Sequence, residues 1–187
     1  IHRVGLAHRR LSILDLSRDA DQPMVSKDGN FRIVFNGEIY NYVELRSELA
    51  SKGIQFRTTS DTEVLLEAYK LFGINFFKKL EGMWSFAIWD NKKKNLLLSR
   101  DRFSEKPLYV FQNRKGLYFG SEIKYLKSLA QKKFKINEGH LVRYLFQGYK
   151  SLHKYNSTFY ENVENFPNAS YANIGKGLKI KYKKYWK

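Results

Sequence analysis

Cysteine is absent from this 187-residue chain, which has only three prolines and two methionines. Without a thiol, these residues cannot form a disulfide, a thiolate metal site or a cysteine nucleophile. The four histidines are scattered without the spacing of metal ligands, so we predict no metal site. No apolar run reaches the roughly 18 residues that a membrane span requires. We therefore expect a globular protein with no membrane partner.

The first eight residues, Ile1 to His8, lack an initiator methionine and lack the apolar stretch and cleavage site of a signal peptide. Their pattern is typical of the middle of a strand. We therefore expect that the beginning of the natural protein, with its first strand, precedes this chain. The missing signal peptide favours a cytoplasmic location.

Acidic residues are scarce relative to basic ones, at 18 against 34, which gives a net charge of +16. Residues 1–123 carry 20 basic and 15 acidic side chains, whereas residues 124–187 carry 14 basic and only 3 acidic ones. Such a basic region can attract nucleic acid or an acidic partner, but it is more often a solvated lysine-rich surface. Because no zinc-finger, RNP or phosphate-loop motif is present, nucleic acid is not an expected partner.

Apolar residues make up 43% of the chain and aromatic residues 16%, enough for a substantial core. The apolar run at residues 31–35 predicts a buried strand that ends at Asn36-Gly37. Asn41 with Glu44 predicts a capped helix that ends near Gly53. Residues 56–59 read as a second strand, and Ser60 with Glu63 predicts a second capped helix.

The central part of the chain changes to β structure. Residues 83–89 and 96–99 predict a hairpin that is buried on both faces, and residues 107–111 and 116–119 predict a second hairpin. Helices are expected at residues 121–129 and 137–147, the latter capped by Asn137. From residue 151 the periodicity is weak. This order of helices, antiparallel hairpins and helices predicts an α+β fold built in layers.

Seven segments in order resemble the class II glutamine amidotransferase domain of asparagine synthetases. They are His8-Arg9-Arg10-Leu11-Ser12-Ile13, Asn36-Gly37-Glu38-Ile39-Tyr40-Asn41, Ser60-Asp61-Thr62-Glu63-Val64, Gly82 to Asp90, Arg100-Asp101-Arg102-Phe103, Lys106-Pro107-Leu108-Tyr109 and Ser121-Glu122-Ile123-Lys124. Any one segment alone would be weak evidence, but seven in the family's order make chance implausible.

The resemblance implies a four-layer αββα fold of the N-terminal-nucleophile type, with two antiparallel sheets between helices. It implies a glutamine amidotransferase type 2 domain at residues 1–150 and a basic extension or linker toward a synthetase domain at residues 151–187. In such domains the nucleophile is a cysteine at the mature N-terminus. Its free α-amine, with a pKa near 8, can accept the thiol proton.

The resemblance also assigns roles to residues of the glutamine pocket. Arg10, with Leu11 beside it, is expected to bind the α-carboxylate of glutamine, a task that suits a planar bidentate donor. Glu38 and Asp61 are expected to hold the α-ammonium. The Asn36 side chain and the Gly37 backbone N–H are expected to form the oxyanion hole.

Each of these residues also has an ordinary structural interpretation. Arg10 can be a surface arginine, Asp61 a favourable residue in a first helical turn, and Asn36-Gly37 a turn. The sheet core is expected to contain Trp84, Phe86, Ile88 and Trp89. Arg100, Asp101 and Arg102 are expected to form a buried or interdomain ion network.

The implied function is hydrolysis of glutamine to glutamate and ammonia, followed by ATP-dependent amidation of aspartate to asparagine. ATP and magnesium are expected in the synthetase domain and no cofactor in this one. The expected partners are glutamine, the synthetase domain of the same chain and a second copy in a homodimer. Two alternatives stay open: another carboxylate acceptor, such as a surface polysaccharide or natural product, and an inactive binding domain. The first alternative is motivated by Ser104 and Glu105, at a position where the family more often has Gly-Ile or Gly-Glu, and by the basic C-terminal region.

Overall fold

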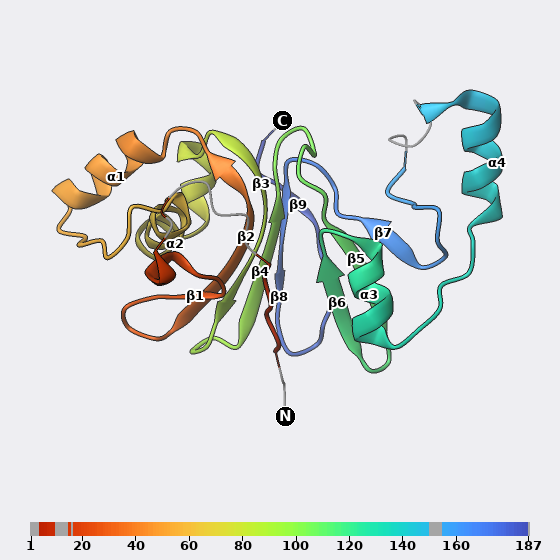
Figure 1. Cartoon of the computed structure of the whole chain (residues 1–187), viewed down its shortest axis with the longest axis horizontal. Helices are drawn as coiled ribbons and strands as arrows, with labels where there is room; N and C mark the ends of the chain where they lie inside the picture. Colours follow the sequence, from red (N-terminus) through yellow and green to blue (C-terminus); the bar gives the residue numbers. More distant parts are fainter. Residues whose placement is uncertain (1–3, 10–14, 16, 150–154, 187) are drawn as a thin grey trace.

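The computed structural model describes residues 4–9, 15, 17–149 and 155–186. They form four layers: helices, a large sheet, a small sheet and helices again (Figure 1). The strands are β1 (Met24–Val25), β2 (Phe31–Ile39), β3 (Gly82–Asp90), β4 (Asn95–Arg100), β5 (Tyr109–Asn113), β6 (Gly116–Gly120), β7 (Val163–Asn165), β8 (Ser170–Ile174) and β9 (Lys183–Lys184). The helices are α1 (Tyr42–Ser51), α2 (Asp61–Phe72), α3 (Ile123–Ala130) and α4 (Glu138–Gln147), with short 3-10 helices at Arg18–Ala20 and Gly73–Lys79.

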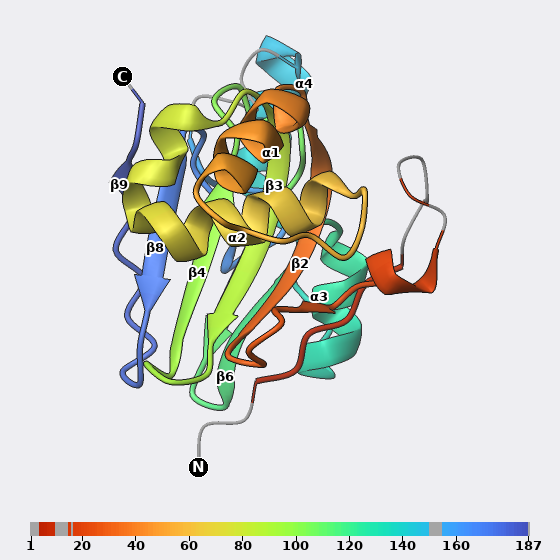
Figure 2. The same cartoon turned by 90° about the vertical axis from the view of Figure 1, so that its left-hand side faces the viewer.

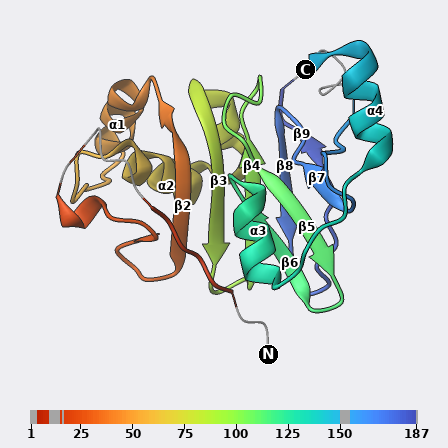
Figure 3. The ribbon, with the colours of Figure 1, turned by 45° about the vertical axis from the view of Figure 1, so that its right-hand side comes forward.

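The large sheet has six strands in the order β1-β2-β3-β4-β8-β9, and the small sheet has three in the order β6-β5-β7. All neighbouring strands are antiparallel. In Figure 2, α1 and α2 lie across one face of the large sheet, and Figure 3 shows α3 against β5 and β6. The sequence prediction of an αββα arrangement with two antiparallel sheets is therefore confirmed.

Three apolar cores lie between the layers. Successive side chains of a strand point to opposite faces of its sheet, so one strand contributes to two of these cores. In β2, Ile33 and Phe35 pack with α1 and α2, whereas Val34 packs between the two sheets. The third core joins the small sheet to α3 through Phe111, Leu126 and others. As the sequence predicted, the β3 side chains are core residues: Trp84 and Ile88 are at most 1% exposed.

Several local predictions differ from the structure. The strand at residues 31–35 continues to Ile39, because Asn36 and Gly37 pair with β3 and do not turn. Residues 56–59 form no strand: the Glu63 carboxylate accepts the backbone N–H groups of Arg57 and Thr58, so these amides have side-chain partners. The Asn41 side chain does not cap α1 and instead binds backbone groups of Lys79 and Glu81.

The last part of the chain, expected to be an extension or linker, contributes strands to both sheets. β8 lies between β4 and β9 in the large sheet, and β7 pairs with β5 in the small one. Ala172 and Ile174 of β8 are buried in the core between the sheets. Residue 150 therefore does not mark an end of the folded unit, since the short strands pair through long-range contacts that local periodicity does not reveal.

The remaining helix, α4, projects from the small-sheet side of the molecule (Figure 1), and its Phe146 is 85% exposed. The predicted cap is present, because the Asn137 side chain accepts the His140 N–H at 3.1 Å. None of the helices that the described residues form has the length and apolar character to cross a membrane.

Candidate functional site

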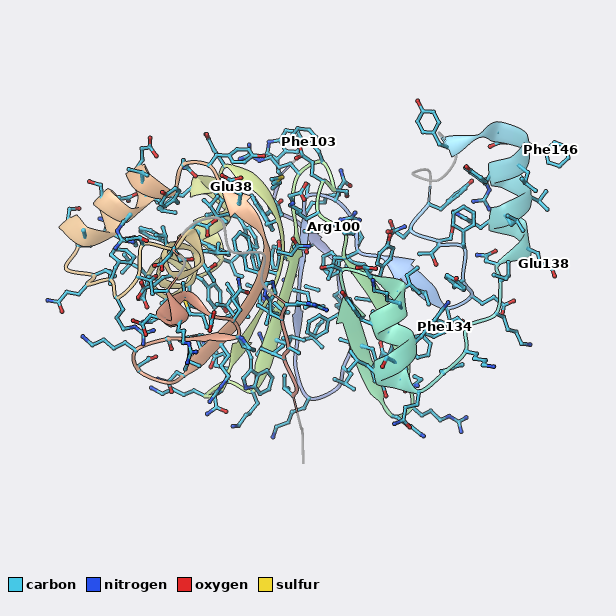
Figure 4. The ribbon with its side chains drawn as sticks, viewed as in Figure 1. Glu38, Arg100, Phe103, Phe134, Glu138 and Phe146 are labelled. Carbon is cyan, nitrogen blue, oxygen red and sulfur yellow. The ribbon has the colours of Figure 1, made fainter. Side chains whose placement is uncertain are left out.

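The second half of β2 brings three of the predicted site residues together. Asn36, Gly37 and Glu38 lie opposite Ser85, Trp84 and Met83 of β3. Glu38 is near the end of β2, on the same side of the molecule as Phe103 (Figure 4). The predicted site therefore lies at the end of β2, where the chain leaves the large sheet.

The close approach of β3 requires a glycine at position 37. A Cβ at this position would lie 2.2 Å from the Met83 carbonyl oxygen and 2.8 Å from the Trp84 Cα. Both atoms belong to the backbone of the neighbouring strand, so neither can move without distorting the sheet. Only glycine fits here, and its small size leaves the backbone of β2 accessible at this point.

The N–H of Gly37 points away from β3. In an antiparallel ladder, the hydrogen-bonding groups of successive residues point to opposite sides. The N–H groups of Phe35 and Ile39 point away from β3, because they donate to side chains: Phe35 to Gln22 Oε1 at 2.6 Å and Ile39 to Asp61 Oδ2 at 3.1 Å. Gly37 lies between them and shares their orientation.

On this edge, β1 pairs only with Arg32 and Ile33 of β2. Within the part of the chain that the structure describes, no strand is paired with β2 on the Gly37 side. The Gly37 N–H is thus an edge donor between two amides that are already occupied. This geometry is what an oxyanion hole requires of a backbone amide.

The Asn36 side chain lies on the face of β2 that is turned toward the small sheet. Its Nδ2 donates to the Ser121 Oγ at 3.1 Å, which fixes the amide relative to the turn after β6. Because a side-chain amide has two N–H donors, one is left for a ligand. The Asn36 and Gly37 donors therefore come from adjacent residues of one rigid strand.

Asp61 is the first residue of α2 and is 6% exposed. Burial raises the pKa of this carboxyl, and the nearby charge of Glu38 raises it further, while the Ile39 N–H acts in the opposite direction. Two carboxylates that repel each other at the end of β2 form a favourable site for a cation, since an ammonium would relieve both the burial cost and the repulsion. This is the position at which the α-ammonium of an amino acid is expected.

α2 begins at Asp61 because of local hydrogen bonds. Ser60 is a true N-cap, with its Oγ accepting the Thr62 N–H at 3.1 Å. The second half of the predicted capping box is absent, since Glu63 binds Arg57 and Thr58 instead of the Ser60 N–H. Asp15 accepts the Thr59 N–H at 2.7 Å, which joins the segment before β1 to the same loop.

The loop after β4 lies on the same side of the molecule as the end of β2 (Figure 4). Asp101 accepts the N–H groups of Phe103, Glu105 and Lys106. The Arg100 guanidinium, seen between the sheets in Figure 4, donates to three carbonyl oxygens, those of Ser104, Lys106 and Phe166. The expected ion network is therefore mainly a network of charged side chains bound to backbone.

Ser104 in this loop has φ of 62°. The left-handed conformation that a glycine adopts freely is thus held by a serine at this position. Desolvation is the largest cause that raises the pKa of Tyr40. The negative charges of Glu105, Glu38 and Asp101 raise it further. The loop and the end of β2 therefore lie within electrostatic range of each other.

Two of the predicted site residues, Arg10 and Leu11, lie outside the described residues. No group of three or more His, Cys, Asp or Glu side chains that could hold a metal ion occurs in residues 4–9, 15, 17–149 and 155–186. The structure adds Gln22 and Ser121 to the site. Ser121 belongs to a recognised segment, but no pattern around Gln22 indicates that its side chain binds the β2 backbone.

Comparisons with known proteins identify the family to which the chain belongs. A family model described as "Glutamine amidotransferase domain" matches residues 2–186. The chain belongs to this family. The chain is 41% identical over 174 residues to asparagine synthetase [glutamine-hydrolyzing] 2 of Bacillus subtilis (strain 168), covering 92% of this chain and 23% of that protein. It is 44% identical over 142 residues to asparagine synthetase [glutamine-hydrolyzing] 1 of the same organism, covering 76% and 22%.

A solved structure of glutamine phosphoribosylpyrophosphate amidotransferase from B. subtilis, in complex with ADP and GMP, has the same fold. Its TM-score to this chain is 0.68 at 17% identity, and the match covers 96% of this chain and 34% of that one. The chain spans less than a quarter of the length of the two synthetases that it matches. The chain therefore corresponds to one part of each of these longer polypeptides.

Proposed function

We propose that this domain hydrolyses glutamine and supplies ammonia for the ATP-dependent amidation of aspartate to asparagine. The observation that carries the proposal is the edge donor of Gly37, placed beside the Asn36 amide and near the buried carboxylate of Asp61. The names of the two B. subtilis relatives support the choice of asparagine as product.

In the proposed reaction, the side-chain amide carbonyl of glutamine lies against β2. Attack by a thiolate converts the carbonyl oxygen to an oxyanion, which accepts hydrogen bonds from the Gly37 N–H and the Asn36 Nδ2. The α-amine of the cysteine passes the proton taken from the thiol to the leaving nitrogen, so collapse of this intermediate releases ammonia and leaves a thioester, which water then hydrolyses to glutamate and the free thiol. Asp61 and Glu38 bind the α-ammonium, and Arg10, with Leu11 beside it, binds the α-carboxylate.

The thiolate belongs to the cysteine that the family places at the mature N-terminus, outside these 187 residues. Intact-mass and peptide mass spectrometry of the parent protein tests this part of the proposal. We expect the first residue to be cysteine, with the initiator methionine removed. Any other first residue would contradict glutamine hydrolysis by this site.

The acceptor is tested separately. We propose that a synthetase domain of the same polypeptide binds ATP and magnesium, that the parent forms a homodimer, and that it works in the cytoplasm. The parent should form asparagine when it is incubated with glutamine, aspartate, ATP and magnesium. Glutamine hydrolysis without asparagine, but with amidation of another carboxylate, would retain this domain's role and reject aspartate as acceptor.

A further inference from the structure

The edge of β2 beside the small β1 strand is held by side chains from two different parts of the chain. Gln22, in the segment before β1, uses both ends of its amide: Nε2 donates to the Phe35 carbonyl oxygen at 3.1 Å, and Oε1 accepts the Phe35 N–H at 2.6 Å. Its side-chain amide thus makes the two hydrogen bonds that the backbone of a neighbouring strand would make with Phe35.

On the other side of Gly37, Asp61 accepts the Ile39 N–H at 3.1 Å. Gln22 Nε2 also lies 3.5 Å from the Thr62 Oγ1, next to Asp61 in the first turn of α2. The start of α2 is therefore connected to the β2 edge at two points, two residues before and two residues after Gly37.

This arrangement has a consequence for the middle amide. If Phe35 and Ile39 were unbound, three edge amides of β2 would compete for water or for a ligand, and the edge could shift or twist. With both flanking amides occupied, Gly37 presents a single donor in one direction. A donor helps catalysis in proportion to how well it is oriented before the charge develops.

We propose that Gln22 is a positioning residue of the oxyanion hole, which acts by fixing the β2 edge so that the Gly37 N–H points at the reacting carbonyl. Gln22 itself need not touch glutamine. The inference rests on the proposed glutamine hydrolysis and extends it to a residue outside the recognised segments. Asp61 makes a comparable contact with the Ile39 N–H on the other side of Gly37. Because Asp61 is also an expected ligand of the α-ammonium, a variant at this position would not distinguish a loss of binding from a loss of positioning.

The test uses the full-length parent protein and the variants Gln22→Met, Gln22→Glu and Asn113→Ala. Methionine keeps the length and shape of glutamine and removes both hydrogen bonds. Glutamate keeps the acceptor for the Phe35 N–H and places a negative charge against the Phe35 carbonyl oxygen. Asn113 is the matched control, since its Oδ1 accepts two backbone N–H groups, of Lys115 and Gly116, in the β5–β6 hairpin.

Glutamine hydrolysis is measured as kcat and KM, with the unfolding midpoint of each variant beside it. Removing a whole oxyanion donor costs roughly 100- to 1,000-fold in kcat, so we expect Gln22→Met to lower kcat by about 10-fold or more. KM should change by less than about 3-fold, because the groups that bind the amino-acid end are intact. Gln22→Glu should fall between Gln22→Met and the wild type, and Asn113→Ala should keep the wild-type kcat.

Amide exchange in the same full-length proteins gives an independent readout. Gln22→Met should accelerate exchange at Phe35 and leave that of the β3–β4 pairs unchanged. A folded Gln22→Met protein with wild-type kcat overturns the inference, and if that variant does not fold, a wild-type kcat in Gln22→Glu overturns it. An inactive wild-type parent with an N-terminal cysteine rejects the proposed function itself, and the inference with it.

Discussion

Gly37 is the residue whose replacement has the most clearly defined consequence. Gly37→Ala would place a methyl group 2.2 Å from the Met83 carbonyl oxygen. Because the contact is with backbone of the central β3 strand, we expect the free energy of unfolding to fall by about 2–4 kcal/mol in urea titrations. Gly116→Ala is the control, since its new Cβ would meet nothing closer than the Tyr118 ring at 4.0 Å. Equal stabilities of the two variants would contradict the packing described here.

Asp61 predicts a pH dependence of stability. Burial raises its pKa above the ordinary value of 3.8, so the folded state binds the proton more tightly than the unfolded state. The contribution of this carboxyl to stability is therefore highest at low pH, when it is protonated, and decreases as the pH rises through its folded pKa. Asp61→Asn removes this dependence.

The measurement is the free energy of unfolding of both proteins between about pH 4 and pH 8, without glutamine. The stability of Asp61→Asn relative to the wild type should increase with pH over the lower part of this range and then level off. A difference that stays flat, or that falls with pH, would mean that the carboxylate is well solvated or paired in the folded protein.

At the scale of residues, the motifs of the sequence predict a candidate site but not the geometry of its hydrogen-bond donors. Asn36, Gly37, Glu38 and Asp61 stand in recognisable segments. That the Gly37 N–H is the open amide depends on Gln22, which is 13 residues before Phe35 and binds both backbone groups of that residue. Such a contact has no periodicity and no motif, so only the folded chain reveals it.

At the scale of elements, we predict that loss of the two side-chain helix caps, Ser60 and Asn137, has different effects on stability. Ser60 caps α2, which is buried against the large sheet, whereas Asn137 caps the projecting helix α4. Ser60→Ala should lower the global free energy of unfolding by about 1–2 kcal/mol, because α2 unfolds only with the core. Asn137→Ala should increase fraying of α4, seen as faster amide exchange there. If Asn137→Ala lowered global stability as much as Ser60→Ala, α4 would be part of the cooperative core.

Elements were predictable where their own side chains decided the structure. The β3–β4 hairpin, the β5–β6 hairpin and α2 follow from apolar patterning and polar turns. The predicted strand at residues 56–59 was wrong, because Glu63 takes the backbone amides that a strand would need. The extension of β2 to Ile39 was missed, because Asn-Gly commonly forms a turn and only the pairing with β3 overrides that tendency.

At the scale of the whole molecule, the C-terminal part of the chain supplies β8 and β9, the last two strands in the order of the large sheet. Ala172 in β8 is fully buried between the two sheets, and the next residue, Asn173, is exposed. Ala172→Glu should abolish folding or lower the free energy of unfolding by more than about 3 kcal/mol, since it buries a charge without a partner. Asn173→Glu should change it by less than about 0.5 kcal/mol.

Circular dichroism and urea titration of the two variants check this prediction. A well-folded Ala172→Glu protein would mean that β8 is a dispensable extension of a domain that ends near residue 150. The low periodicity of residues 155–186 concealed their role, because β7 and β9 are only three and two residues long. Their partners are distant in sequence, and distant pairing leaves no local pattern.

The central claim is that the end of β2 forms an oxyanion hole for glutamine hydrolysis. The most direct measurement is the glutamine hydrolysis rate of the parent protein and its Asn36→Ala variant, with Asn113→Ala in the β5–β6 turn as a control. We predict that Asn36→Ala lowers kcat by about 100-fold or more, with little change in KM, and that Asn113→Ala retains the wild-type rate. Wild-type kcat in a folded Asn36→Ala protein would contradict the assignment of this site.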